Sequence, residues 1–318
     1  MELVNTFNDT IFLKDDSNLE KMIEELKIER NRNPYYKDKI DYDIRMLEFG
    51  LEGEKEIAYN LKNSNIGMYV LHDITIEYED LKAQFDYIIV TRGYIYLIEC
   101  KNLIGNIYVD NNGQFIRKYE YKGKKYTESM YSPYTQIIRN KEILKKRWIN
   151  KHSKLRVAIQ SKYFDTLWYK PLVVLANSKS ILNTKNAPKE VRGSTIKVDE
   201  LCNYIKKDIE NYDKSLLNSK KDMEDLANSL LQYNTVNFNN IANKYKTIAE
   251  EKALEHKLRT FRRDRSKKLN IPAYYVFTDE EMIKLISNKP QTINQLNNIL
   301  SNIKIKCHGK QIIKLINE

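Results

Sequence analysis

The sequence contains few of the residues that build disulfide-bonded or zinc-binding domains. Its 318 residues include only three cysteines and four histidines. Cys100, Cys202 and Cys307 are far apart and form no CxxC pair, which argues against a structural zinc site and against a disulfide framework. If the protein binds a metal ion, we therefore expect oxygen ligands to hold it.

Long hydrophobic segments are also missing. No run of about 18 apolar residues occurs, so we expect no membrane span. The N-terminal residues include acids and lack a basic stretch followed by an apolar core, and so do not resemble a signal peptide. The expected location is the cytoplasm. The sequence contains no GxxxxGK[ST] motif and therefore no such nucleotide-binding motor, and its patterns leave the oligomeric state open.

Negative charge is in the minority. The chain has 54 Lys and Arg against 43 Asp and Glu, a formal net charge of +11 and a pI near 9.2. A protein this basic is attracted to polyanions, and nucleic acid is the first candidate. The alternative is a composition that is simply rich in lysine, without a polyanionic partner.

Two apolar runs joined at Arg92-Gly93 predict a β-hairpin over residues 84–101. Both runs are rich in β-branched and aromatic residues, and glycine at the joint permits the positive φ of a tight turn. With a two-residue loop the numbers of facing residues add to 185, so Asp86 lies opposite Glu99 on one face. Lys101, two residues beyond Glu99, points to the same face.

This face would place two acids next to each other. Like charges directly opposite each other destabilise a sheet, and a divalent cation such as Mg²⁺ or Mn²⁺ would remove the repulsion. The alternative is an ordinary surface salt bridge between Lys101 and Asp86 or Glu99. Spacing alone leaves both interpretations open.

Two further polar residues occupy informative helical positions. A helix predicted over residues 50–61 has Glu54 on its buried stripe, where an acid must be paired, protonated or bound to a cation. The alternative is a glutamate in the first turn of the helix, favoured by the helix dipole. A second helix, predicted over residues 132–150, begins with a Ser-Pro pair and has Gln136 near its start.

Two predicted helices are strongly basic. One is the 132–150 helix; the other lies between Lys252 and Lys268, where eight Lys and Arg stand against two acids, a net charge of +6. Each is either a solvated helix face or a surface that contacts phosphate groups. The candidate nucleic-acid-binding residues are Arg139, Lys145, Lys146, Arg147, Lys257, Arg259, Arg262, Arg263, Arg265 and Lys267.

Residues 50–140 resemble the NERD (nuclease-related) domain of the PD-(D/E)XK nuclease superfamily. This resemblance implies an α/β (α+β) fold in which helices flank a mixed sheet. Phe85 departs mildly from the family pattern, which often has an aliphatic residue there. The matching pieces are Gly53-Glu54, Gln84-Phe-Asp86, Ile98-Glu-Cys-Lys-Asn102, Gly105 and Pro133-Tyr-Thr-Gln136.

The resemblance also implies a single catalytic site. Its members would be Glu54, Asp86, Glu99, Lys101 and Gln136. The implied cofactor is Mg²⁺ (or Mn²⁺), bound by Asp86, Glu99 and the backbone carbonyl of Cys100. Glu54 would complete the coordination shell directly or through water.

Residues 249–318 resemble the HRDC domain, a helical nucleic-acid-binding module found on helicases and RNase D-type enzymes. Ser301-Asn302 stands where the family usually has a glycine after an Ile-Leu pair. Nucleic-acid binding by this segment is implied. The matching pieces are Leu258-Arg259 through Arg263 and Lys267, the stretch IPAYYVFTD at residues 271–279, Lys289-Pro-Gln-Thr292 with Leu296, and His308-Gly309-Lys310 before a last predicted helix at residues 312–316.

These observations predict four segments. They are an N-terminal helical segment (1–47), a NERD-like nuclease domain (48–180), a connector of strand and helices (181–248) and an HRDC-like helical domain (249–318).

The expected function is metal-dependent hydrolysis of phosphodiester bonds in nucleic acid, with DNA as the expected substrate and the HRDC-like domain aiding binding. A helicase or another DNA-processing protein would be a fitting partner. The alternative is a non-catalytic adaptor that binds nucleic acid on a nuclease-like scaffold. A structural protein with basic helices is a third interpretation.

Overall fold

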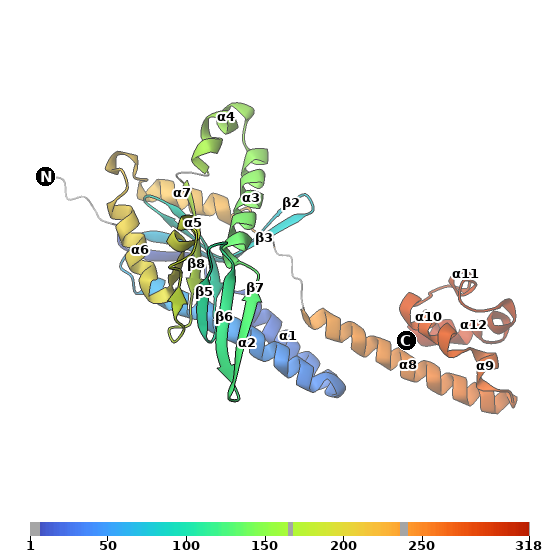
Figure 1. The fold of residues 1–318 in the computed structure, drawn as a ribbon. Coiled ribbons are helices and arrows are strands. Elements are labelled where there is room, and N and C mark those ends of the chain that lie inside the picture. Colours follow the sequence, from blue (N-terminus) through green and yellow to red (C-terminus); the bar gives the residue numbers. More distant parts are fainter. Residues whose placement is uncertain (1–6, 165–167, 236–240, 318) are drawn as a thin grey trace. The chain divides into compact units, whose positions relative to one another are not determined.

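The computed structural model describes residues 7–164, 168–235 and 241–317, and the chain divides into two compact units (Figure 1). The first comprises Met1–Ile23 and Asp43–Asn239, and the second comprises Glu24–Tyr42 and Asn240–Glu318. None of the helices in the described ranges combines the length and apolar character that crossing a bilayer requires.

The core of the first unit is a six-stranded mixed sheet. Its strands are, in spatial order, β1 (Thr10–Lys14), β2 (Met68–Tyr78), β3 (Leu81–Thr91), β4 (Ile95–Lys101), β8 (Tyr169–Leu175) and β10 (Thr195–Lys197). β2, β3 and β4 are antiparallel neighbours, whereas β1 is parallel to β2 and the strands β4, β8 and β10 are parallel to one another. The inner strands are nearly continuous apolar runs because both faces of the sheet are covered.

Helices pack on both faces of this sheet. α3 (Pro133–Lys151) and α7 (Lys220–Leu231) share one apolar core with the strands, and α2 (Lys37–Lys62) and α6 (Val198–Glu210) share the other. This confirms the predicted mixed sheet flanked by helices. The unit also contains α4 (Lys154–Tyr163) and the 3₁₀ turn η3 (Lys214–Leu216).

The N-terminal segment is not wholly helical. β1 lies within it and joins the sheet beside β2, ahead of helix α1 (Asn18–Arg32) and the 3₁₀ turn η1 (Pro34–Tyr36). α2 then runs without interruption, so the helix predicted at residues 50–61 is the end of a longer one. Gly53 lies inside it, where a Cβ would meet Cβ of Asn102 at 2.7 Å and Cβ of Ala176 at 3.2 Å. Glycine therefore lets α2 lie close to the ends of β4 and β8.

A second sheet follows β4 in the chain. Its strands are, in spatial order, β7 (Lys124–Met130), β6 (Phe115–Tyr121), β5 (Asn106–Val109) and β9 (Leu182–Asn183). Ile107 and Phe115 pack against Leu175 at the end of β8 and Val191 of the short helix α5 (Lys189–Gly193). β6 and β7 continue beyond this core as a two-stranded ribbon that projects from the unit (Figure 1).

Residues 181–235, expected to form a connector, are part of the first unit. β10 extends the sheet beyond β8, α6 covers one face and α7 covers the other. Met223, Ala227 and Leu230 of α7 belong to the same buried core as β2 and β3. The polar, asparagine-rich composition of this stretch hid a stripe of apolar residues at helical spacing.

The second unit contains a helical bundle, as predicted. Its helices are α8 (Ile241–Leu269), α9 (Ala273–Val276), α10 (Asp279–Asn288), α11 (Ile293–Leu296) and α12 (Asn302–Asn317). Leu258, Phe277, Leu285 and Ile312 lie fully buried in its core. A capping box between Thr278 and Glu281 starts α10.

The last helix is longer than the sequence suggested. His308 and Gly309 lie inside α12 rather than ahead of it. A Cβ at Gly309 would lie 3.1 Å from Cγ2 of Ile305 and 3.2 Å from Cδ1 of Ile293. This glycine is therefore a close-packing residue against α11 and does not mark a helix start.

Candidate active site

The hairpin of β3 and β4 has the predicted register. Tyr87 faces Ile98 and Val90 faces Ile95, so the numbers of facing residues add to 185. The length of a hairpin loop sets the register of its two antiparallel strands, so a two-residue loop at Arg92-Gly93 determines which residues face each other.

The loop is two residues long, as expected, but the reason for its glycine differs from the expected one. The N–H of Thr91 donates to the carbonyl oxygen of Tyr94 at 3.0 Å and closes the loop. Gly93 does not adopt the positive φ that was predicted. A Cβ at Gly93 would instead meet the ring of Tyr212 at 3.1 Å, so the missing side chain makes room for that tyrosine.

The two strands separate where the acids lie. The ladder ends at Tyr87 and Ile98, one pair short of Asp86 and Glu99, and β4 continues beside β8 alone. The side chain of Asp86 takes the place of the missing backbone partner, because its Oδ2 accepts a hydrogen bond from the N–H of Cys100 at 2.6 Å. The hairpin is therefore open at this end, with the Asp86 carboxylate in the opening.

Lys101 is held by two groups. Its Nζ lies 2.6 Å from Oε1 of Glu99 and donates to Oε1 of Gln136 on α3 at 3.4 Å. The side chain of Glu99 is only 3% exposed and that of Lys101 26%, so this ion pair is partly buried, unlike the surface salt bridge considered from the sequence. Burial lowers the pKa of Lys101, but the charges of Glu99 and Asp86 outweigh it, so the pKa is raised and the ammonium stays protonated.

Asp86 has the least favourable charge environment of the site. Burial raises the pKa of its carboxyl group well above the usual value, and the charges of Glu99 and Glu54 raise it further. Lys101 lowers this pKa without offsetting the other effects. A carboxyl group in these surroundings either keeps its proton or loses it when a further cation binds nearby.

Glu54 approaches from α2, on the other side of the sheet from α3. Its Oε2 lies 2.8 Å from Nε2 of His72 and accepts a hydrogen bond from Oγ of Ser17 at 3.1 Å. Oη of Tyr87 donates to the main-chain oxygen of Glu54 at 2.8 Å. Glu54 is buried and paired, in the second half of a 26-residue helix, so the first-turn interpretation is wrong.

Three further residues, Ser17, His72 and Asp73, belong to the surroundings of the site, although no sequence motif singles them out. Asp73 has a positive φ of 51°; its Oδ2 accepts from the N–H of Asn18 at 2.6 Å and its Oδ1 from Nε2 of Gln84 at 3.0 Å. Facing residues of β2 and β3 have numbers that add to 159, as in His72 and Tyr87. The two-residue turn at 79–80 was the signal from which this register could have been found.

The donors at the open end of the hairpin suit a hard divalent cation. Asp86 and Glu99 offer carboxylate oxygens and Cys100 a main-chain oxygen, the ligand types that Mg²⁺ and Mn²⁺ prefer. Across residues 7–164, 168–235 and 241–317, no three His, Cys, Asp or Glu side chains are already arranged around a common point. The carboxylate of Glu99 is paired with Lys101 and that of Glu54 with His72. The negative charge of these acids still raises the pKa of Asp86, and a bound cation would offset that charge.

The predicted basic residues of α3 differ in exposure. Arg139 and Lys146 are exposed, whereas Lys145 and Arg147 are half-buried. Cζ of Arg147 lies 5.5 Å from the centre of the Tyr233 ring, so its guanidinium packs against the tyrosine that follows the end of α7. Arg139 lies one turn beyond Gln136 and is the exposed cation nearest to the site along this helix.

The basic residues of α8 fall into two groups. Arg262 donates to Oδ1 of Asp279 at 2.8 Å and to the carbonyl oxygen of Phe277 at 3.2 Å. Nε of Arg265 donates to Nδ1 of His308 at 3.4 Å. These two half-buried arginines join helices of the bundle. The exposed candidates are Lys257, Arg259, Arg263 and Lys267.

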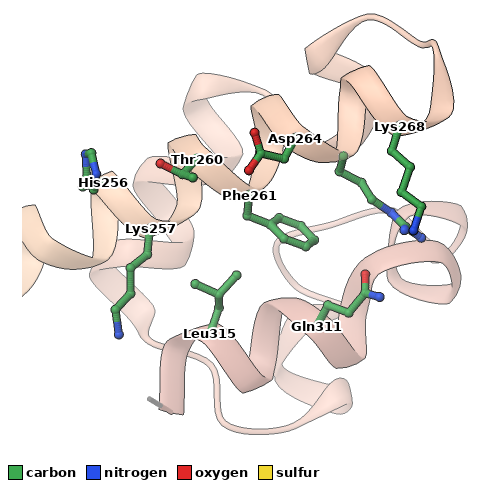
Figure 2. A pocket seen from close by; sticks show the side chains of 9 residues that line it. His256, Lys257, Thr260, Phe261, Asp264, Lys268, Gln311 and Leu315 are labelled. Atoms are coloured by element: carbon green, nitrogen blue, oxygen red, sulfur yellow. The ribbon is translucent and has the colours of Figure 1, made fainter.

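A pocket of about 470 Å³ lies between α8 and α12 (Figure 2). Phe261 and Leu315 line it with apolar groups, and Lys257 and Lys268 add basic ones. The remaining lining residues are His256, Thr260, Asp264, Arg265 and Gln311. The pocket combines an aromatic ring with positive charge on the α8 side of the bundle.

Comparisons with known proteins identify both parts of the chain. No curated protein and no solved structure gives a significant match. The family model of the nuclease-related domain, NERD, matches residues 49–176, a range that contains the hairpin, Glu54 and Gln136. The model of the HRDC domain matches residues 251–316, from Glu251 within α8 to the last turn of α12. The chain thus contains a nuclease-related NERD domain at residues 49–176 and an HRDC domain at residues 251–316.

Proposed function

We propose that the protein is a metal-dependent nuclease that hydrolyses phosphodiester bonds of nucleic acid, with DNA as its substrate. The observation that carries the proposal is the half-buried Asp86 carboxyl group, of raised pKa, in the open end of the hairpin beside Glu99 and Lys101. The NERD match supports nuclease chemistry and the HRDC match supports nucleic-acid binding.

Asp86, Glu99 and the main-chain oxygen of Cys100 would hold Mg²⁺ or Mn²⁺. Glu54 would serve as a further donor, directly or through water. When bound, such a cation polarises the scissile phosphate and lowers the pKa of a bound water molecule. Its charge would also offset the repulsion that keeps the pKa of Asp86 high.

Lys101 is the residue we assign to the reacting phosphate. Its ammonium is protonated and fixed between Glu99 and Gln136, so its orientation costs little at the moment of reaction. A fixed positive charge stabilises the negative charge that develops on the phosphate oxygens in the transition state. The amide of Gln136 would orient the attacking water or a phosphate oxygen, and exposed Arg139 would contact the neighbouring backbone phosphates.

The HRDC domain would add a second binding site on the same chain. Four exposed basic residues of α8 are available for phosphate contacts: Lys257, Arg259, Arg263 and Lys267. Two linked sites bind one nucleic acid more tightly than either alone, because the second contact is intramolecular. This contribution would raise substrate affinity and leave the chemical step unchanged.

A cleavage assay on the full chain tests the proposal. Linear duplex DNA, plasmid, single-stranded DNA and RNA would be incubated with Mg²⁺, Mn²⁺ or EDTA. We expect cleavage of DNA with either metal and none with EDTA. Lys101→Ala should abolish cleavage and retain the circular dichroism spectrum of the wild type.

Lys170→Ala is the matched control. Lys170 also forms a partly buried ion pair, with Asp208 at 2.7 Å, and lies on β8 opposite Tyr96, toward the other end of β4. This variant should cleave like the wild type. Undiminished cleavage by Lys101→Ala would refute the assignment, and binding without cleavage under every condition would favour the nucleic-acid-binding adaptor.

A further inference from the structure

The ribbon of β6 and β7 extends beyond the core of its own sheet (Figure 1). Its pairing runs from Phe115 and Met130 to Tyr121 and Lys124, and a turn containing Gly123 closes it. Phe115 is buried at its root, whereas β7 is exposed along nearly its whole length. A two-stranded ribbon gains little stability in water from its own pairing, so packing does not account for its length.

Basic and aromatic residues dominate this ribbon. Residues 115–130 contain five Lys and Arg against two Glu, a net charge of +3. The rings of Tyr119 and Tyr126 face each other across the strands, with centroids 5.2 Å apart and planes at 14°. Cζ of Arg117 lies 4.3 Å from the centre of the Tyr119 ring. The three cations nearest the tip, Lys122, Lys124 and Lys125, are exposed.

The base of the ribbon packs against the chain segment that follows the candidate active site in sequence. Gly105 follows Lys101 by four residues and has a φ of +102°. A Cβ at Gly105 would lie 2.5 Å from the carbonyl oxygen of Lys118, so glycine is needed for this close approach. Nε of Arg117 donates to the carbonyl oxygen of Ile104 at 2.7 Å. The ribbon is thus held directly against the chain that follows the lysine of the site.

We propose that the ribbon enters a groove of double-stranded nucleic acid and positions the duplex at the Asp86–Lys101 site, an inference that rests on the proposed nuclease function. The major groove of B-DNA is wide enough for a two-stranded β-ribbon. Lysines at the tip neutralise phosphates on either side of the groove. The charge of the ribbon and its attachment beside the site both point to this ligand.

A duplex fits this element better than a single strand does. Proteins that bind unpaired bases present exposed aromatic faces along a basic groove. The half-buried ring of Tyr119 instead contacts the Tyr126 ring and the guanidinium of Arg117, and its hydroxyl donates to Oε1 of Glu128 at 2.6 Å. These contacts stiffen a convex, projecting ribbon, which is the shape that a groove accepts.

Equilibrium binding tests the proposal without relying on cleavage. Fluorescence anisotropy in EDTA would measure the affinity of the full chain for a short DNA duplex and for a single strand, over a range of salt concentrations. The ribbon variant combines Lys122→Gln, Lys124→Gln and Lys125→Gln. We expect the slope of log affinity against log salt for the duplex to fall by about 0.9 for each lysine that neutralises a phosphate. Single-strand affinity should fall less than duplex affinity.

The matched control removes three exposed lysines elsewhere in the first unit, by Lys206→Gln, Lys207→Gln and Lys214→Gln on α6 and the turn after it. It makes the same charge change and should keep the wild-type salt slope. Unchanged duplex affinity and slope in the ribbon variant would overturn the ribbon proposal, and equal losses for both probes would overturn the groove assignment. No binding by the wild type at any salt concentration would contradict the proposed function instead.

Discussion

Nε2 of His72 lies 2.8 Å from Oε2 of Glu54, and the two side chains are only 6% and 10% exposed. Nδ1 of the same ring lies 3.1 Å from the carbonyl oxygen of Asp15, which can only accept, so Nδ1 carries a proton. A second proton must then lie between Nε2 and the carboxylate. Burial lowers the pKa of His72, but its hydrogen bond and charge interaction with Glu54 outweigh this and raise it. His72 therefore offsets the charge of Glu54 and fixes its orientation.

Removal of His72 should destabilise the NERD domain. His72→Ala leaves Glu54 buried without its partner, which should lower the free energy of unfolding by about 3 kcal/mol or more. Adding Glu54→Gln should restore part of the loss, because removing both charges costs less than removing one. Urea unfolding of the two single variants and the double variant measures this coupling. Strictly additive losses would show that the two residues are independent.

Substitution of Gly53 should displace Glu54 together with α2. Gly53→Ala gains about 1 kcal/mol of helix propensity. Its new methyl group would overlap Asn102 and Ala176 at the end of the sheet, which costs about 1–3 kcal/mol. We expect a net loss of stability and of cleavage, measured by thermal unfolding and the nuclease assay.

Gly50 provides the control for that experiment, since it lies in the same helix. The nearest atom to a Cβ at Gly50 is Cδ1 of Leu19, at 3.8 Å, an ordinary contact. Gly50→Ala should therefore raise the free energy of unfolding by about 0.4–1 kcal/mol. Equal effects of the two substitutions would rule out close packing as the reason for Gly53.

Asp86→Asn should separate stability from function. The pKa of Asp86 is raised by burial and by neighbouring acids, so its ionised form destabilises the fold at neutral pH. The amide oxygen can still accept the hydrogen bond from Cys100, and the variant should be at least as stable as the wild type. Mn²⁺ at a hundredfold excess over its dissociation constant should stabilise the folded wild type by about 2.7 kcal/mol. This stabilisation should raise the melting temperature of the wild type. An equal Mn²⁺ effect on Asp86→Asn would exclude this residue as a ligand.

The HRDC domain should lose stability in mild acid. Burial, followed by the charge of Arg265, lowers the pKa of His308 below its usual 6.5. The unfolded chain then binds the proton more tightly than the folded chain, so the contribution is complete above pH 6.5 and is lost as the pH falls through the lowered pKa. The melting temperature of the HRDC transition should decline from pH 7.5 to 5.5, and His308→Gln should reduce this decline. His256→Gln, at an exposed position on α8, should leave it unchanged.

The local part of the candidate site was predictable from sequence. The Arg92-Gly93 loop set the pairing of β3 and β4, and the alternation of side chains along a strand then placed Glu99 and Lys101 on one face. The start of α3 followed from its Ser-Pro pair, which brought Gln136 to the first turns of the helix. Each of these inferences depends on neighbours within a few residues, where backbone geometry leaves little choice.

The partners of Glu54 were beyond such reasoning. Helical periodicity indicated that Glu54 is buried, but His72 reaches it from a strand and Ser17 from the start of another helix. The apolar pattern of the sequence likewise did not place α7 and β10 in the first unit, because the core of that unit is built from segments that lie far apart in the chain. The close approach of α2 that brings Glu54 to the sheet depends on the space left at Gly53. Such contacts depend on how whole elements pack. A buried charge needs a partner, and that partner can come from any element that the fold places nearby, however distant it is in the sequence.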